Sequence, residues 1–248
     1  MTTRESRWIV PEWPVPARVK VLSTLRTGGV SAGDYASFNL AQHVGDDPAA
    51  VAANRALLRQ AGGVPSEPLW LNQVHGTGVA IHAGGNVTPP TADASVAFER
   101  GRVCAVMTAD CLPVVFTDRG GTRIGVSHAG WRGLAGGVLE ATIAALGVPG
   151  RELRAWLGPA IGQDAFEVGA EVRAAFLQRS AANAAAFVAG ASGKYHADLY
   201  ALARNTLGQA GVTEVHGGGW CTSRQREEFF SFRRNPKTGR MATLAWLD

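Results

Sequence analysis

The sequence predicts an α+β fold, in which a single layered domain (residues 1–248) contains mixed β-sheets flanked by helices. Three observations predict this fold class. The chain has 248 residues, 46% of them hydrophobic, enough to bury a substantial core. Helical and strand-like segments are interleaved, yet many strand-like segments are joined by turns too short for a crossover helix. No internal repeat or low-complexity linker divides the chain.

Four segments are predicted to be helices. The first, Pro48–Ala61, follows two aspartates, has proline at its first position and ends at a pair of glycines. The others are residues 134–146, 166–179 and 198–210. The alanine-rich segment 181–186 is also expected to be helical rather than a tether.

Apolar runs rich in β-branched residues predict the strands. The predicted strands are residues 18–25, 69–74, 78–82, 94–98, 103–108, 114–116, 124–126 and 154–157, followed by a final hairpin over 229–246 with its turn at 235–239. The hairpin 114–126 is the most informative, because Asp118 and the Gly120-Gly121 pair suit a tight turn. A turn centred between residues 119 and 120 places Val115 opposite Ile124 and Cys111 opposite His128. Opposed side chains share one face, with β-carbons roughly 4.5–5.5 Å apart.

Composition and charge exclude several classes of protein. The net charge is only +4 and the basic residues are scattered, so we expect no nucleic-acid partner. No segment has the length of a signal-peptide core or a membrane span, so we expect a cytoplasmic protein, acting as a monomer without a membrane partner. The three cysteines are odd in number and form no Cys-x-x-Cys pair, which argues against a disulfide framework.

Three short motifs carry the chemistry. They are Leu71-Asn-Gln-Val-His75-Gly, Thr108-Ala-Asp-Cys111-Leu-Pro and His128-Ala-Gly-Trp-Arg-Gly. One cysteine and two histidines leave one position of a tetrahedral zinc ion open, which is the pattern of a catalytic zinc site. Thiolate and imidazole ligands suit zinc, with copper as the second metal. His43, His82, His196 and His216 lack comparable surroundings and are interpreted as surface or core residues.

Two alternatives use the same residues. In a Cys/His hydrolase, Cys111 is the nucleophile, His128 its base, and Asp110 or Asn72 orients the base. The third alternative is copper-dependent oxidation of phenols. Multicopper laccases take most of their ligands from His-x-His pairs, whereas this chain has six histidines and no such pair. A copper ion at the Cys/His site would therefore support only weak oxidation.

At these motifs the sequence resembles the YfiH-like family, long labelled polyphenol oxidase or multicopper laccase domain. The matching segments, in order, are Arg26-Thr-Gly-Gly-Val-Ser31, Ser37-Phe-Asn-Leu40, His43-Val-Gly-Asp-Asp47, Asn54-Arg55, Asn72-Gln-Val-His-Gly76, Thr108-Ala-Asp-Cys-Leu-Pro113, His128-Ala-Gly-Trp-Arg-Gly133, Cys221-Thr222, Phe229-Phe-Ser-Phe-Arg-Arg234 and Thr238-Gly-Arg240. They cover nearly the whole chain. One departure is Phe232, where tyrosine is more usual.

The resemblance implies an activity and a ligand set. His75, Cys111 and His128 would hold zinc in one domain with layered mixed sheets. The implied activity is that of a purine nucleoside phosphorylase. Such an enzyme converts adenosine, inosine, guanosine or methylthioadenosine plus phosphate to the base and ribose 1-phosphate. Adenosine deamination accompanies it. Relatives are also linked to peptidoglycan editing, in which an amide bond is cut.

Five further residues are candidates for the site. Arg26, beside two glycines, and Arg132, four residues after His128, could bind phosphate through bidentate guanidinium contacts. Asn72 and Gln73 could hydrogen-bond the substrate. Asp110 could act as a general acid or orient a zinc-bound histidine. We therefore expect Cys111, Asp110 and Arg132 to be catalytic, and Arg26, Asn72 and Gln73 to bind substrate.

Overall fold

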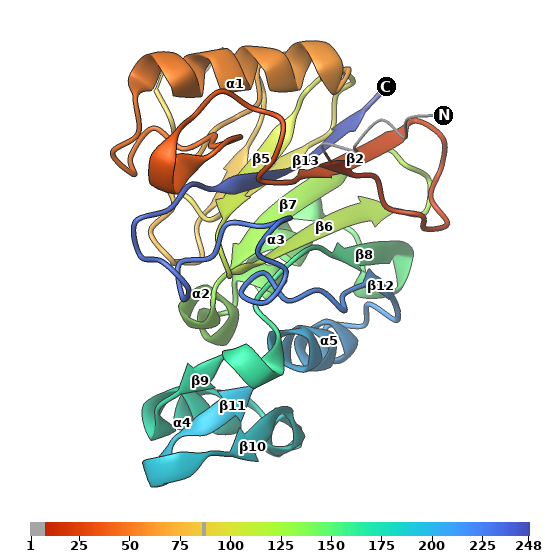
Figure 1. The fold of residues 1–248 in the computed structure, drawn as a ribbon. Helices are drawn as coiled ribbons and strands as arrows, with labels where there is room; N and C mark the ends of the chain where they lie inside the picture. The colour runs from red at the N-terminus through yellow and green to blue at the C-terminus, as the bar shows by residue number, and fades with distance from the viewer. Residues whose placement is uncertain (1–7, 86–87) are drawn as a thin grey trace.

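Two stacked β-sheets form the centre of the molecule, as the computed structural model of residues 8–85 and 88–248 shows (Figure 1). A helix covers the outer face of one sheet, and further helices cover the outer face of the other. A smaller sheet projects below these layers (Figure 1). The predicted α+β class, with mixed sheets flanked by helices, is confirmed.

The upper sheet has four antiparallel strands in the order β1-β2-β13-β5. Their bounds are β1 Trp8–Ile9, β2 Val19–Thr24, β13 Met241–Leu247 and β5 Cys104–Thr108. Alternate residues of β13 face opposite layers. Leu244 and Trp246 pack in one apolar cluster with Leu58 of the covering helix α1 (Pro48–Ala61), whereas Ala245 packs toward the second sheet. The helix begins as predicted, with Asp47 accepting a hydrogen bond from the amide of Ala49.

The second sheet is mixed, with six strands in the order β12-β8-β6-β7-β4-β3. Its inner pairs are antiparallel, and the two outermost pairs are parallel. The bounds are β12 Glu214–Gly217, β8 Leu153–Leu157, β6 Leu112–Asp118, β7 Ile124–Ala129, β4 Ala94–Ala97 and β3 Val79–Ile81. Its lower face packs on α3 (Val138–Leu146) and α5 (Leu199–Gln209), which together bury the largest apolar cluster.

The projecting part contains the three-stranded sheet β10-β11-β9 and α4 (Ala170–Arg179). Its strands are β10 Phe187–Ala189, β11 Tyr195–Ala197 and β9 Glu167–Val168. The predicted helix 166–179 therefore begins four residues late, because residues 167–168 pair with β11 instead. Segment Ala181–Ala186 is a 3-10 helix, and the other 3-10 turns are Gly33–Tyr35, Gly150–Glu152, Gln163–Ala165 and Ala191–Gly193.

The predicted helix 134–146 is two helices. The chain forms α2 (Trp131–Gly136) and α3, and Gly137 separates them with a φ of 102°. This left-handed conformation is costly for any residue with a β-carbon. Because apolar spacing continues across the break, the sequence pattern alone indicates one helix.

The hairpin forms with a register two residues away from the predicted one. Val115 pairs with Val126 and Pro113 with His128, so Cys111 lies just before the start of β6. The turn is displaced because Oδ1 of Asp118 accepts hydrogen bonds from the amides of residues 122 and 123. A two-residue shift leaves every side chain on its predicted face. His128 therefore still shares a face with Pro113.

Two predicted strands are loops. Residues 69–74 form only isolated bridges, Leu69 to Cys104 and Asn72 to Thr91. In the final predicted hairpin only β13 is a strand. Phe229 and Phe230 are buried in a small cluster with Met241, and the preceding residues follow an irregular path. No helix in the described ranges is both long and apolar enough to cross a bilayer.

The break at Gly137 predicts a large effect of a small substitution. Gly137→Ala should lower the free energy of unfolding by roughly 1–2 kcal/mol, because alanine must adopt the left-handed conformation. Gly208→Ala is the matched control, since Gly208 lies in α5 and its added β-carbon would meet no atom within 4 Å. That variant should be neutral or slightly stabilising. Urea denaturation of both measures the difference, and equal stabilities would contradict the backbone argument.

Candidate active site

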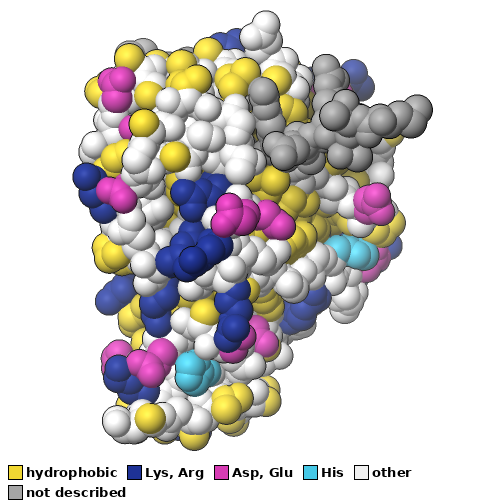
Figure 2. Space-filling view, viewed as in Figure 1, with side chains coloured by type: hydrophobic (Ala, Val, Ile, Leu, Met, Phe, Trp, Pro, Cys, Tyr) yellow, Lys and Arg dark blue, Asp and Glu magenta, His cyan; other side chains and the backbone are white. Residues whose placement is uncertain are grey.

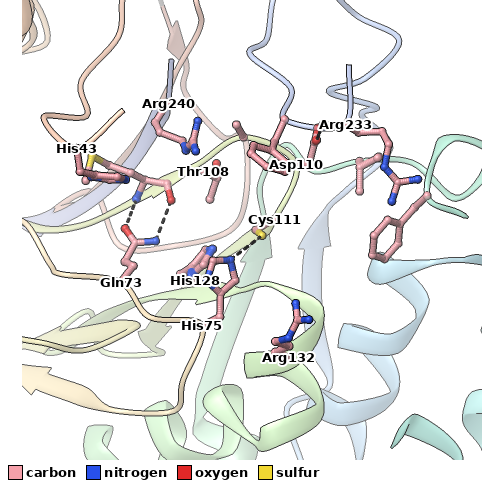
Figure 3. Close-up of a pocket in the computed structure, with 15 residues that line it drawn as sticks. His43, Gln73, His75, Thr108, Asp110, Cys111, His128, Arg132, Arg233 and Arg240 are labelled. Carbon is pink, nitrogen blue, oxygen red and sulfur yellow. Dashed lines mark hydrogen bonds between the residues drawn. The ribbon is translucent and has the colours of Figure 1, made fainter. Parts of the chain in front are cut away.

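Three side chains from separate segments meet at one edge of the stacked sheets. His75 lies in the loop before β3, Cys111 directly precedes β6, and His128 is in β7. Their ligand atoms all lie within 4.8 Å of one another. Cys111 Sγ is 3.9 Å from His75 Nε2, and the two imidazole rings have centroids 4.8 Å apart (Figure 3). The predicted trio is therefore assembled despite the shifted register.

Asp93, directly before β4, positions both histidines. Its carboxylate is fully buried, and Oδ1 accepts a hydrogen bond from His128 Nδ1 at 2.8 Å. The backbone amides of Val74, His75 and Gly76 donate to the same carboxylate at 3.1, 2.9 and 2.7 Å. These bonds hold His75 in a left-handed conformation, with a φ of 59°. They also leave Nε2 of His128 as its ligand atom.

The electrostatics favour a thiolate at Cys111. Burial alone would raise the pKa of the thiol, but the charge and hydrogen bonds of His128 and His75 lower this pKa to about 6. Burial would lower the pKa of His128, but the Cys111 thiolate and the hydrogen bond to Asp93 raise it to about 9. Thiolate is the form of cysteine that binds metals and attacks electrophiles.

Gly130 makes room for the ligands. A β-carbon at this position would lie 2.9 Å from Cys111 Sγ and 3.1 Å from Cδ2 of His75, closer than side chains normally approach. The residue has an ordinary φ of −62°, so its role is space rather than backbone freedom. The glycine after His128-Ala in the sequence motif is thereby explained.

The donor set fits a metal ion. Zinc bonds of about 2.3 Å to sulfur and 2.0–2.1 Å to nitrogen separate tetrahedral S and N ligands by about 3.5 Å. The distance of 3.9 Å between Cys111 and His75 is within a few tenths of an ångström of this value. One thiolate and two imidazoles could therefore hold zinc or another soft metal ion.

The carboxylate of Asp110 accepts its hydrogen bonds from the C-terminal loop. Its Oδ1 accepts a hydrogen bond from the Thr222 hydroxyl at 2.6 Å. Its Oδ2 accepts from the Ser231 hydroxyl at 3.0 Å and from the amide of Arg233 at 2.7 Å. Asp93, which the sequence analysis missed, makes the contact to His128 instead. Asp110 thus connects the turn before Cys111 to the C-terminal loop. In this turn Asp110 itself has a φ of 92°.

The trio opens into a cavity of about 410 Å³, within the usual size range of small-molecule sites. The cavity is lined by His43, Gln73, His75, Met107, Thr108, Ala109, Asp110, Cys111, His128, Arg132, Ile161, Phe166, Phe232, Arg233 and Arg240 (Figure 3). Three arginines, the exposed ring of Phe232 and the half-buried ring of Phe166 therefore line the cavity together with the three candidate ligands. Such a lining suits a ligand that carries both an anionic group and a flat ring.

The three arginines differ in how they are held. Arg233 donates to the carbonyls of Ala165 and Glu167, and Arg240 donates to the carbonyls of residues 238 and 239. The Arg132 guanidinium stacks over Trp131 at 4.4 Å, and within residues 8–85 and 88–248 no hydrogen bond or ion pair engages it. Arg132 is thus the arginine with the most donors available to a ligand.

Six of the eight predicted site residues line this cavity, and Arg26 and Asn72 do not. Asn72 donates to the Thr91 hydroxyl at 3.1 Å, outside the cavity. Arg26 lines a second cavity instead. Gln73 lines the first, but both ends of its amide bind the backbone of Met107, at 2.9 and 2.8 Å.

Sequence reasoning missed several lining residues. His43, interpreted above as a surface or core residue, faces the cavity, and burial followed by the charges of Arg240 and Arg55 lowers its pKa. Arg240 and Phe166 were not singled out either. Asp93 did leave a signal, since it is the one acid in the apolar run Ala92-Asp-Ala-Ser-Val-Ala97.

Comparison with known proteins identifies the family of this chain. The family model described as multi-copper polyphenol oxidoreductase laccase matches residues 20–248. A purine nucleoside phosphorylase of Pseudomonas aeruginosa is 53% identical, with 97% of this chain and 98% of that protein covered. The purine nucleoside phosphorylase YfiH of Escherichia coli is 50% identical over 98% and 99% of the two chains.

Solved structures share the whole fold. A Neisseria meningitidis protein is 53% identical, has a TM-score of 0.95 and aligns over 98% of this chain and all of that one. YlmD of Geobacillus stearothermophilus is 29% identical, with a TM-score of 0.90 over 99% and 98% of the chains. The chain therefore belongs to the multi-copper polyphenol oxidoreductase laccase family, in which YfiH and other similar relatives are named purine nucleoside phosphorylases.

Proposed function

We propose that this protein is a zinc-dependent purine nucleoside phosphorylase. Its substrates would be phosphate and adenosine, inosine, guanosine or methylthioadenosine, and adenosine deamination would be a side activity. The observation that carries the proposal is the group His75, Cys111 and His128, whose two histidines are held by Asp93, in an arginine-lined cavity. The names of relatives with about half of their residues identical support the same activity.

The chemistry assigns roles to residues of the cavity. In phosphorolysis a phosphate oxygen bonds to C1′ of the ribose while the bond from C1′ to the purine nitrogen breaks, and the purine keeps the electron pair. Arg132 would hold the phosphate, and Arg240 would add a second positive charge. Phe232, 52% exposed, would stack on the purine. Zinc, when bound, would supply Lewis acidity and an acidified water, which deamination requires.

A cysteine amidase is the second candidate, because one observation favours it. Asp93, His128 and Cys111 follow one another in the order of an acid, a base and a nucleophile, and the pKa of Cys111 is lowered to about 6. Such an enzyme could cut an amide bond in peptidoglycan without a metal. Phenol oxidation through bound copper is the weaker third alternative, since only one trio of ligands is present among the described residues.

We also propose that the enzyme acts on small molecules in the cytoplasm, as a monomer. All three cysteines are free thiols, which suits a reducing compartment and which the role of Cys111 requires.

Metal analysis together with product detection tests the activity. The purified protein should contain about one zinc per chain, and adenosine with phosphate should give adenine and ribose 1-phosphate. His75→Ala should lose the metal and this activity together, because two remaining ligands cannot hold zinc tightly. Full activity of metal-free protein would contradict the zinc proposal. Cleavage of a peptidoglycan amide without nucleoside turnover would favour the amidase.

Asp93→Asn tests how the site is positioned. The amide keeps the size of the carboxylate but turns one acceptor into a donor that faces amide hydrogens. Zinc affinity, measured by competition with a chelator, should fall by about 10–100-fold. The control is Asp34→Asn, an exposed carboxylate away from the cavity, which should leave the affinity unchanged. Unaltered zinc affinity in a folded Asp93→Asn protein would show that zinc binding does not need the hydrogen bond from His128 Nδ1 to Asp93.

Arg132→Ala tests phosphate binding. Loss of a charge-assisted contact should raise the KM for phosphate by about tenfold or more, with a much smaller change in the KM for adenosine. Arg100→Ala, at an exposed position outside the cavity, is the matched control. Steady-state kinetics with each substrate varied in turn measure both constants. An unchanged KM for phosphate would remove Arg132 from this role.

A further inference from the structure

We call the cavity at His75, Cys111 and His128 the metal cavity. A second cavity, of about 520 Å³, shares the loop 222–234 with it. We call it the arginine cavity, and its lining consists of Arg26, Thr27, Ala36, Ser37, Arg226, Glu227 and Arg234. Figure 2 shows basic side chains gathered near the middle of one face of the molecule, with acidic ones beside them. Residues 226, 227 and 234 of the loop line the arginine cavity, whereas residues 232 and 233 line the metal cavity.

The charges in the arginine cavity are unbalanced. Three guanidinium groups face one carboxylate, and within the described part of the chain none of these arginines forms an ion pair. Burial lowers the pKa of Arg26, and burial followed by the nearby charge of Arg26 lowers the pKa of Arg234. Positive groups are therefore held close to one another, an arrangement that a bound anion would stabilise.

Backbone carbonyls fix two of these guanidinium groups. Arg26 stacks over Phe230 at 4.9 Å, donates from Nε and Nη2 to the carbonyl of Ala36 at 3.1 and 2.8 Å, and donates from Nη1 to the carbonyl of Arg226 at 3.0 Å. Arg234 donates to the carbonyls of residues 222, 223 and 229 at 2.9, 3.0 and 2.6 Å. A guanidinium has five N–H donors, so each retains two for a ligand.

We propose that the arginine cavity is a binding site for a small phosphate-bearing anion, separate from the metal cavity. Rigid guanidinium groups match the geometry and the double charge of a phosphate group, either free or as a monoester. The volume of the cavity leaves room for a sugar beside the phosphate. Arg234 holds the carbonyl of Thr222, whose hydroxyl donates to Asp110, so contacts lead from this cavity to the residue beside Cys111.

Arg226 and Glu227 offer variants that leave the rest of the fold intact. Both are exposed, and within the described residues no hydrogen bond or ion pair engages either side chain. Arg226→Ala should weaken anion binding at this site by about tenfold or more, because a direct cationic contact is lost. Glu227→Gln should tighten it severalfold, because a negative charge leaves the cavity. Arg224→Ala, on the same loop but paired with Asp164, should have no effect.

Isothermal titration calorimetry at constant ionic strength tests the proposal with two probes, inorganic phosphate and ribose 5-phosphate. Under the proposed function the metal cavity would also take phosphate, so the site is identified by the opposite changes in Arg226→Ala and Glu227→Gln. Equal affinity for both probes supports a site for free phosphate, and tighter binding of ribose 5-phosphate supports a site for a monoester. Isotherms of both variants that match the wild type for both probes would overturn the proposal, whatever the catalytic activity.

Discussion

The buried carboxylate of Asp93 is the constraint on which the candidate site depends. A buried charge is costly unless hydrogen bonds satisfy it, and four N–H groups point at this one. Three are backbone amides of the loop that carries His75, and the fourth is the imidazole of His128. Because the same two oxygens bind the loop of His75 and the ring of His128, neither histidine can move without leaving part of the charge unsatisfied. The two histidines are therefore prearranged by protein contacts.

The layered architecture explains why Cys111 reaches this point. β5 belongs to the upper sheet and ends at Thr108, whereas β6 belongs to the lower sheet and begins at Leu112. The chain crosses between the sheets in three residues, and Asp110 turns it with a φ of 92°. Cys111 thus lies in the link between two rigid layers, directly beside the end of β7 that carries His128. The strands on both sides of such a link restrict its movement, so they also restrict the position of Cys111.

The sequence predicts which side chains share a face of a strand better than it predicts which residues pair across two strands. The register of the predicted hairpin is shifted by two residues, so side chains stay on their predicted faces although their partners across the hairpin differ. The shift arises because side-chain hydrogen bonds to Asp118 set the turn. The ligand trio was predictable from its short motifs. Asp93 left a signal as the one acid in its apolar run, but its role was missed because that role depends on backbone amides 17 to 19 residues earlier in the chain. The strand predicted after Phe229 failed because that apolar segment packs as a buried loop instead.

The loop 222–234 shows how irregular backbone can still be fixed. Asp110 accepts from two hydroxyls and one amide of this loop, while Arg234 donates to three of its carbonyls. Polar groups that would pair in a sheet are thus satisfied by two side chains. Because Asp110 adjoins Cys111, the loop that presents Phe232 to the cavity is bonded to the turn that carries a candidate metal ligand. A displacement of the loop that carries Phe232 must therefore disturb the hydrogen bonds of Asp110, so the two sides of the cavity are connected through this one carboxylate.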